Sequence, residues 1–397
     1  MLPLQGIRIL DLSRMVAGAY CSMILADLGA EVIKIEQPGI GDDTRQWGPP
    51  YVNGESAYFL SVNRNKQSLT LDLRKEKAQG IFRELVKRAD VIVENFRPGT
   101  MEKFRLGYQD LKKLRSDLVY CSISAFGLAG PYKNRPGTDP ALQAVGGLMG
   151  LLGEAGGKPF RIALPLIDMT SGLYAQGAIM AALIARGKDG QSHFIEIALL
   201  DTELSLLLNL GSNYLLTGQI PKRFGNAHPS IVPYNVFQTK DREVLLSASN
   251  DSRWKKLCQS LGLQTLIDDP RFKNTEARLQ NRSALEEILQ EKLLEKTADE
   301  WLAVMDQSDS GVPFAPINSL DKVFNDPHVL TRQIVTTVTH PVTGPVQMVG
   351  MPVRYDEERG KVRLPPPRLG EHNREILSKF LGFKTEEIEN LKKEGVI

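Results

Sequence analysis

The chain is poor in the residues that build metal centres and disulfide frameworks. Three cysteines and five histidines are spread over 397 residues, and no two histidines stand at the spacing of a zinc site. An odd number of distant cysteines fits a reducing compartment and forms no disulfide framework. We therefore expect no metal site, and we interpret each isolated histidine as a structural or surface residue.

The chain also lacks a surplus of charge of either sign. Lysine and arginine total 49 against 47 aspartates and glutamates, which leaves a formal net charge of +2. Nucleic-acid-binding proteins normally carry a clear basic excess, and an anionic membrane surface attracts clustered positive charge. We therefore expect neither a nucleic acid nor a membrane surface as a partner.

Long apolar runs are missing as well. The longest, near 178–184 and 203–211, fall well short of the roughly 20 residues that span a bilayer. The first residues carry no basic segment ahead of an apolar stretch, as a signal peptide would. We expect a cytoplasmic protein, or one of the mitochondrial matrix if a transit peptide has been removed.

Over its first 200 residues the sequence alternates between strand-like and helix-like segments. Segments of helical periodicity, such as 19–28, 75–89 and 166–186, separate short apolar runs. These runs predict strands over 7–12, 31–35, 68–73, 90–93, 118–123 and 194–198. The alternation indicates βαβ units and predicts an α/β fold with a Rossmann-like, mostly parallel sheet.

The pattern changes near residue 225 and predicts a second, smaller α+β domain. Short strands are followed there by helical patterns at 252–261, 283–296 and 298–306. We expect residues 1–200 and 358–397 to form the large domain and residues 226–320 to form the small one. Residues 201–225 and 321–357 would then be the linkers between them.

The motifs of the commonest nucleotide and hydrolase sites are absent. The turn after the first strand, SRMVAGAY, holds one glycine where a dinucleotide site needs three. The sequence contains neither the GxxxxGK[ST] pattern of a P-loop nor the GxSxG pattern of the α/β-hydrolases. These absences argue against a dinucleotide enzyme, a P-loop enzyme and an α/β-hydrolase.

Asp168 stands out among the carboxylates. It lies in ALPLIDMTSGLYAQGAIMAAL, with no other charged residue within six positions on either side. A carboxylate in apolar sequence is costly to bury unless it is paired, caps a helix or takes part in catalysis. A capping role and a catalytic role are compatible, because the N-terminus of a helix favours an ionised carboxylate.

Segments spread over nearly the whole chain, from about residue 4 to residue 397, resemble one family. They are residues 4–45, 58–73, 89–108, 120–131, 167–183, 311–329 and 365–372. Together they are similar to the class III CoA-transferases, the family of formyl-CoA transferase, carnitine CoA-transferase and 2-methylacyl-CoA racemase. The resemblance implies the class III CoA-transferase fold, in which the large domain binds CoA and two chains interlock as a homodimer.

The resemblance also implies covalent catalysis by Asp168. In the family an aspartate at this position attacks the acyl-CoA thioester and gives a mixed anhydride, which the released thiolate converts to an aspartyl-CoA thioester. An acceptor acid then enters and the steps run in reverse. CoA, acyl-CoA and small carboxylic acids are the substrates, and no permanently bound cofactor is expected. Water must be excluded, because it would hydrolyse both intermediates.

The resemblance assigns contacts with CoA position by position. Val16 and Ala17 would approach the thioester, although the formyl-CoA enzymes have glutamine where this chain has Val16. The family often has a basic residue where this chain has Gln37, so we expect Arg14 or Arg45 to supply that charge. Leu71 and Arg74 would flank the adenine, and Lys103 would meet a phosphate. The expected contacts along the pantetheine and phosphates are Asn95, Phe96 and Arg97.

Residue 138 distinguishes two activities within the family. The racemases have a His–Asp pair there, whose histidine transfers a proton, whereas this chain has Thr138 and Asp139. Threonine is not a base at neutral pH, so CoA transfer is favoured over racemisation. Asp139 is expected to support Asp168, either by orienting it or as a structural cap. A non-catalytic acyl-CoA-binding relative is the other alternative, and the intact Asp168 argues against it.

The acids to be exchanged are indicated by three segments. GDDTRQWGPP, SVNRNKQS and NAHPSIVPYNVFQTKD look most like the type that moves CoA between succinyl-CoA and glutarate. A dicarboxylic acid needs a second anchor for its distal carboxylate. The sequence does not rank the polar candidates for this anchor, which are Arg14, Arg45, Arg64, Asn226 and His228.

Overall fold

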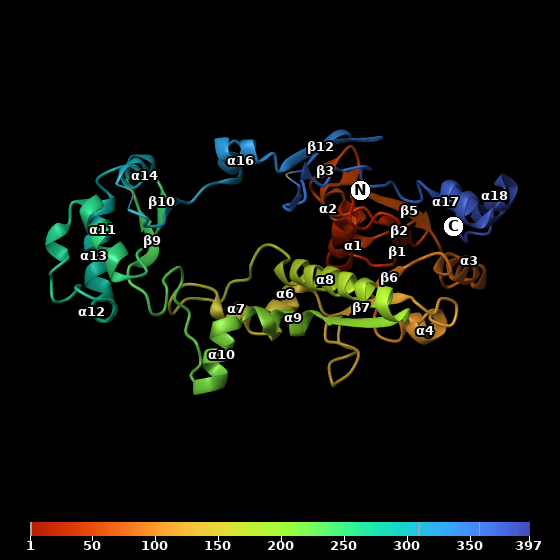
Figure 1. Cartoon of the computed structure of the whole chain (residues 1–397), viewed down its shortest axis with the longest axis horizontal. Helices are drawn as coiled ribbons and strands as arrows, with labels where there is room; N and C mark the ends of the chain where they lie inside the picture. The colour runs from red at the N-terminus through yellow and green to blue at the C-terminus, as the bar shows by residue number, and fades with distance from the viewer. Residues whose placement is uncertain (1, 309, 357) are drawn as a thin grey trace. The chain divides into compact units, whose positions relative to one another are not determined.

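The computed structural model describes residues 2–308, 310–356 and 358–397 (Figure 1). The chain forms two compact units. The first comprises the residues up to 148 together with 161–219 and 332–397, and the second comprises 149–160 and 220–331.

A six-stranded sheet is the frame of the first unit. All neighbouring strands are parallel, in the order β5-β2-β1-β6-β7-β8. The strands are β1 (Arg8–Asp11), β2 (Glu31–Glu36), β5 (Lys66–Thr70), β6 (Val91–Glu94), β7 (Val119–Ser124) and β8 (His193–Ala198). The expected α/β fold with a mostly parallel sheet is confirmed, and each expected strand overlaps one of these six.

Apolar side chains point to both faces of this sheet, because successive strand residues point in opposite directions. Ile9 and Val32 belong to the core cluster covered by α1 (Ala17–Asp27) and α8 (Leu166–Asp189). Leu10 and Ile33 belong to the cluster on the other face. Helices on both faces explain why the central strands β1, β6 and β7 are buried along nearly their whole length.

The other face is covered by helices from distant parts of the chain. They are α3 (Glu76–Val86), α17 (Asn373–Leu381) and α18 (Thr385–Lys393) (Figure 1). Ile376, Phe380 and Leu391 pack in the same cluster as Leu10 and Leu69. Residues 373–397 thus complete a core that begins with the first strand.

The remaining elements of the first unit are mostly short. They are η1 (Asp43–Gln46), β3 (Tyr51–Val52), β4 (Glu55–Ser56), α2 (Ala57–Val62), α4 (Thr100–Lys103), α5 (Tyr108–Leu111), α6 (Asp139–Val145), α9 (Leu199–Leu206), α10 (Leu208–Thr217), β12 (Val335–His340), β13 (Gly344–Val349), β14 (Arg354–Tyr355) and β15 (Glu358–Arg359). A further helix, α7 (Leu148–Leu151), stands at the junction of the two units. In the part of the chain that the structure describes, no helix has the length and apolar character needed to cross a bilayer.

The second unit combines an antiparallel sheet with helices. The sheet order is β11-β10-β9, with β9 (Tyr234–Gln238), β10 (Glu243–Ser247) and β11 (Phe314–Pro316). Trp254, Phe272 and Trp301 fill its core. The helical elements are α11 (Asp251–Leu261), η2 (Gln264–Leu266), α12 (Thr275–Gln280), α13 (Arg282–Leu293), α14 (Ala298–Gln307), α15 (Leu320–Phe324) and α16 (Pro327–Arg332).

The boundaries of the units differ from those expected at the junctions. Residues 201–219, expected in a linker, belong to the first unit, where α9 packs against α6 and α8. Residues 332–357, also expected in a linker, belong to that unit with the β12–β13 hairpin. Residues 149–160 belong to the second unit. Sequence periodicity marks elements but not which core they join, and the junctions differ for that reason.

Candidate active site

The sheet has a switch point between β1 and β6. Strands β2 and β5 extend it on one side of β1, and β6, β7 and β8 extend it on the other. Loops that leave a switch point in opposite directions open a crevice at the carboxyl ends of the strands. A cavity of 620 Å³ lies there, lined by the loops after β1, β6 and β7 and by the first turn of α8. We call it the Asp168 cavity.

The close approach of α8 to α1 brings Asp168 to this crevice. Gly172 lies one turn after Asp168, and a Cβ atom on it would stand 2.7 Å from the backbone oxygen of Ala17. Glycine alone allows this contact without a shift of the backbone. Because Ala17 begins α1 and also lines the cavity, the contact fixes the distance between Asp168 and the first loop.

Asp139 caps the start of α8. This buried carboxylate accepts the backbone N–H groups of Ile167 (2.7 Å) and Asp168 (3.1 Å) with Oδ2. Its Oδ1 accepts a hydrogen bond from Nε2 of Gln143 at 2.6 Å. The first N–H groups of a helix need acceptors from outside the helix, so Asp139 holds the turn that carries Asp168.

The Asp168 carboxylate itself is partly buried at the cavity wall. Burial raises the pKa of Asp168 to about 7, and the negative charge of Asp139 contributes to the increase. The helix N-terminus favours the anion, but desolvation outweighs that effect here. The helix N-terminus and desolvation therefore act in opposite directions on Asp168, and together they leave its pKa close to neutral.

The residues expected near the thioester and along the pantetheine line the Asp168 cavity together with Asp139 and Asp168. They come from loops that are far apart in the sequence and that the parallel strands bring to one edge of the sheet. The cavity lining includes Val16, Ala17, Asn95, Phe96, Arg97, Asp139 and Asp168.

The residues expected near the adenine lie at a second cavity of 240 Å³, which we call the Arg74 cavity. Leu71, Arg74 and Arg14 line it, and Phe96 lines both cavities. Lys103, at the end of α4, is exposed and lines neither. The two cavities together hold all of the expected site residues but two.

The arginines expected to supply the missing positive charge are already paired. Arg45 lines neither cavity and binds the buried Glu36 at 2.8 Å. Arg14 pairs with Asp43 at 2.6 Å, and Arg74 pairs with the aspartate two positions before it at 2.8 Å. A phosphate group would have to compete with a carboxylate for each of these guanidinium groups.

Three cations that sequence reasoning missed also line the Asp168 cavity: Lys133, Arg135 and Arg161. Within the described ranges, no carboxylate forms an ion pair with any of them. They lie in irregular segments that show no periodicity, so nothing in the pattern marks an inward-facing side chain. The sequence offers one signal for these cations, which is that they lie a few positions before Asp139 or Asp168.

The other candidates for an anchor of a distal carboxylate are placed elsewhere. Arg64 is buried and pairs with Asp27 at 2.6 Å. Asn226 and His228 belong to the second unit. Within the first unit, the cations that line the Asp168 cavity are therefore better candidates than Arg64 for binding a distal carboxylate.

Comparison with known proteins connects this geometry to a family. The sequence profile of "CoA-transferase family III" matches residues 4–373. Proteins named succinyl-CoA:glutarate CoA-transferase from Mus musculus and Homo sapiens are 43% and 42% identical over the whole chain, and the alignments cover 91% and 90% of those proteins. A succinate–glutarate CoA-transferase of Agrobacterium fabrum is 37% identical over 95% of this chain and 96% of that protein.

Solved structures share the fold. A CAIB/BAIF family protein from Brucella suis superposes with a TM-score of 0.85 at 39% identity, over 95% of this chain and 99% of that one. The protein Rv3272 from Mycobacterium tuberculosis superposes with a TM-score of 0.83 at 34% identity, over 94% and 98% of the two chains. These alignments run over nearly the full length of each pair.

Proposed function

Because the chain belongs to CoA-transferase family III, as its sequence resemblance implied, we propose that it moves CoA from succinyl-CoA to a dicarboxylic acid such as glutarate. The position of Asp168 carries the proposal. Asp168 stands in the first turn of α8 and donates its backbone N–H to Asp139. Its residue lines a cavity together with Val16 and Ala17, which are expected near the thioester.

The proposed reaction is two linked acyl transfers through Asp168. Its carboxylate attacks the thioester carbonyl of succinyl-CoA, the C–S bond breaks, and CoA leaves as a thiolate, which gives a mixed anhydride. The thiolate then attacks the aspartyl carbonyl and releases succinate, which leaves an aspartyl-CoA thioester. Covalent catalysis divides one difficult exchange into easier steps.

The second half of the reaction repeats these steps with the acceptor. The carboxylate of glutarate attacks the aspartyl-CoA carbonyl, and CoA leaves again as a thiolate. The thiolate attacks the acceptor carbonyl, which forms glutaryl-CoA and regenerates Asp168. No net electrons are transferred, so the proposal includes no resident cofactor.

We assign the distal carboxylate of the dicarboxylic acids to Arg161. Its guanidinium lines the Asp168 cavity, and among the described residues its hydrogen bonds are two long ones of 3.5 Å to neighbouring backbone carbonyl groups. The causes of the raised pKa of Asp168 are burial and Asp139, with no contribution from a cation. Arg161 thus leaves Asp168 free to react and has its charge available for a second carboxylate.

The lining of the Asp168 cavity also weighs against racemisation. It contains Thr138 and Asp139 but no histidine among the described residues. A racemase needs a base that removes an α-proton near neutral pH. CoA transfer needs only a nucleophile in this cavity, and Asp168 fits that need.

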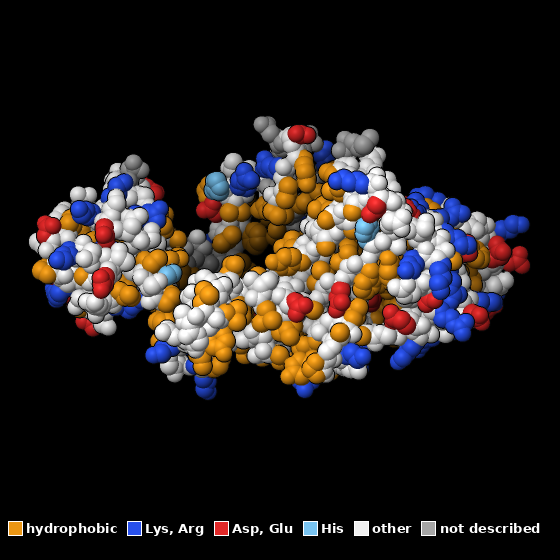
Figure 2. Space-filling view, turned by 60° about the horizontal axis from the view of Figure 1, so that its bottom comes forward, with side chains coloured by type: hydrophobic (Ala, Val, Ile, Leu, Met, Phe, Trp, Pro, Cys, Tyr) orange, Lys and Arg blue, Asp and Glu red, His pale blue; other side chains and the backbone are white. Residues whose placement is uncertain are grey.

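The proposed enzyme is a cytoplasmic homodimer. Three leucines of α10 or at its start, Leu208, Leu215 and Leu216, are 73%, 82% and 84% exposed, and Figure 2 shows other hydrophobic side chains spread over the face that it draws. Large contiguous apolar surfaces are costly in water, which supports burial against a second copy. All three cysteines are buried and unpaired, which fits a reducing compartment.

The test is an exchange assay in which succinyl-CoA is offered with several short mono- and dicarboxylic acids. We expect CoA to pass to glutarate in the wild-type protein. Asp168→Ala should lower the rate at least about a thousandfold, because the nucleophile is lost, while binding of CoA is retained.

A direct measurement follows the intermediate. Hydroxylamine added with succinyl-CoA should convert Asp168 to its hydroxamate, which peptide mass spectrometry detects. Wild-type turnover in Asp168→Ala would disprove the covalent role. Exchange of the α-hydrogen of a 2-methylacyl-CoA with deuterated solvent, without CoA transfer, would favour the racemase instead.

A further inference from the structure

The loop after β1 separates the two cavities. Ser13 and Arg14 line the Arg74 cavity, whereas Met15, Val16 and Ala17 line the Asp168 cavity. An acyl-CoA with its adenine at one cavity and its thioester at the other must pass along this loop. The shape of residues 13–15 therefore sets where the thioester stands relative to Asp168.

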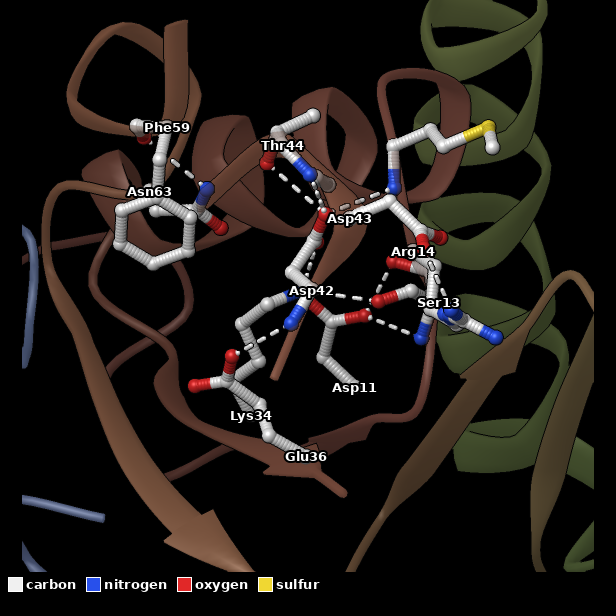
Figure 3. A network of polar contacts seen from close by, with 12 residues as sticks. Asp11, Ser13, Arg14, Lys34, Glu36, Asp42, Asp43, Thr44, Phe59 and Asn63 are labelled. Atoms are coloured by element: carbon white, nitrogen blue, oxygen red, sulfur yellow. Dashed lines mark hydrogen bonds and ion pairs between the residues drawn. The ribbon is translucent and has the colours of Figure 1, made fainter. Parts of the chain in front are cut away.

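Side chains from other elements hold three consecutive residues of this loop. Figure 3 labels Ser13 and Arg14 of the loop together with Lys34 and Asp42. Lys34 of β2 donates its Nζ to the carbonyl of Ser13 at 2.7 Å. Asp42, just before η1, accepts the N–H of Met15 with Oδ1 at 3.0 Å.

Between Ser13 and Met15, the side chain of Asn95 forms two hydrogen bonds with the backbone of Arg14. Its Oδ1 accepts the N–H of Arg14 at 2.8 Å, and its Nδ2 donates to the carbonyl of Arg14 at 2.7 Å. Asn95 follows β6, so the loop is held from both neighbours of β1 in the sheet. Asn95 was expected to contact CoA, but in this structure its amide is engaged with the loop.

An ion pair joins two of these contacts. Lys34 Nζ and Asp42 Oδ2 are 2.8 Å apart, and both side chains are fully buried. Asp42 also accepts the N–H and the hydroxyl of Thr44. A buried ion pair is weak support for stability, because desolvation offsets its Coulomb attraction. Its fixed geometry is better explained by the backbone groups that both partners hold.

The loop conformation is one that needs such support. Met15 has φ +64°, in the left-handed region where a residue with a side chain is strained. Strained residues persist when the surrounding contacts determine their conformation, and they occur often at functional sites. The ion pair also stays charged, because Lys34 and hydrogen bonds outweigh burial and hold the pKa of Asp42 at about 2.

We propose that Lys34, Asp42 and Asn95 are positioning residues that hold the loop Ser13–Met15 in the shape that aligns a bound acyl-CoA thioester with Asp168. The inference rests on the proposed CoA-transferase function. It predicts that weakening these contacts lowers the affinity for CoA and the kcat/KM for succinyl-CoA, and leaves the KM for the acceptor acid unchanged.

The test compares Asp42→Asn with a matched control, Asp27→Asn. Asp27 belongs to another buried ion pair of the first unit, with Arg64, and lines neither cavity. Calorimetry with free CoA should show binding weakened about tenfold or more in Asp42→Asn and unchanged in Asp27→Asn. A misplaced thioester should lower kcat/KM for succinyl-CoA about tenfold to a hundredfold, with the KM for glutarate unchanged.

A second comparison separates positioning from general loss of stability. In Lys34→Gln/Asp42→Asn, the new glutamine amide can donate to Ser13 and accept from the new asparagine amide, so the double variant should recover part of the lost CoA affinity. Asn95→Ala, at a partly exposed position, should weaken CoA binding while the melting temperature stays close to that of the wild type.

Three results would overturn the inference. They are wild-type CoA affinity in Asp42→Asn, an equal loss in Asp27→Asn, and a double variant no better than Asp42→Asn. A wild-type protein that binds no CoA would contradict the proposed function and this inference together. A wild-type protein that binds CoA but does not serve glutarate would contradict only the acid assignment, and the calorimetric comparison would still decide the role of the loop.

Discussion

Asp168 and Asp139 are neighbouring carboxylates in opposite surroundings. Asp139 is buried and accepts hydrogen bonds from two backbone N–H groups and one amide. Asp168 faces the cavity, and burial together with the charge of Asp139 raises its pKa to about 7. Carboxylates whose surroundings differ in this way take different roles, here a structural cap and the proposed nucleophile.

Asp139→Asn should shift the acid limb of the pH–rate profile to lower pH. The nucleophile is the anion, so the wild-type kcat/KM should rise as pH increases through about 7. The substitution removes the negative charge that helps to raise the pKa of Asp168. Burial still raises this pKa, so the acid limb should move only part of the way towards the pKa of an exposed aspartate. Initial rates from roughly pH 5 to 9 measure the shift, and a limb that stays in place or moves upward would contradict this account.

Arg161→Gln should raise the KM for glutarate about tenfold, since a hydrogen bond to a charged group is worth about 1.5–3 kcal/mol. Propionate serves as the internal control, because it has no distal carboxylate for Arg161 to bind. The ratio of kcat/KM values for the two acids is the measurement. An equal loss for both acids would assign Arg161 to CoA or to general stability.

At the scale of single residues, the sequence predicts a functional role when the unusual feature of the residue is visible in its immediate neighbours. Asp168 is visible because it is an isolated charge in an apolar segment. The role of Arg45 cannot be seen in the sequence. Its partners are Glu36, nine positions before it, and the carbonyl of Pro367, 322 positions after it. Only the folded chain brings these groups together, and it pairs the arginine expected to replace the basic residue missing at Gln37 with the buried Glu36.

At the scale of elements, the packing of α8 against α1 is the contact that most directly controls the site. α8 has 24 residues, and its glycines differ in their surroundings. A Cβ on Gly172 would meet the backbone of α1, whereas a Cβ on Gly177 meets nothing within 4 Å. The two positions give a matched pair within one helix.

Gly172→Ala should move the start of α8 away from α1 and lower exchange activity. The added methyl group overpacks the contact, which we expect to destabilise the fold by about 1–3 kcal/mol. Gly177→Ala should instead stabilise the helix by about 0.5–1 kcal/mol and leave activity unchanged. Chemical denaturation and the exchange assay measure both effects. A gain of stability with full activity in Gly172→Ala would refute the close contact.

The strands could be predicted because their apolar residues point to both faces, but their ends could not always be. The third expected strand covered 68–73, whereas β5 spans Lys66–Thr70. The difference lies at Lys66, a fully buried lysine that donates to Asp11, Ala19 and Asn63. A pattern that assigns lysine to the surface starts the strand too late, since two of the partners that allow its burial, Asp11 and Ala19, are distant in the sequence.

At the scale of the whole molecule, the two units and the clustered leucines are the features that periodicity does not resolve. The exposed Leu215 and Leu216 look like ordinary helix residues in the sequence. Which apolar face stays uncovered is known only after the chain has folded, because tertiary packing selects it.

Light scattering should give the wild-type protein about twice the mass of a 44.1 kDa chain. Leu215→Glu/Leu216→Glu should shift it towards the monomer, since two charges would be buried in the subunit contact. Leu114→Glu, at an exposed leucine outside α10, is the control and should stay dimeric. A wild-type monomer, or a double variant that stays fully dimeric, would exclude this face as the interface.

The cover of the sheet by α17 and α18 has a consequence for the order in which the protein matures. Leu10 and Leu69 pack against Ile376 and Ile397, so residues synthesised first wait for residues synthesised more than 300 positions later. At a translation rate of roughly 5–20 residues per second, that interval lasts on the order of 20 seconds or more. During it, this face of the nascent sheet has α3 but lacks α17 and α18, so chaperones that bind apolar segments can act before residues 373–397 are available.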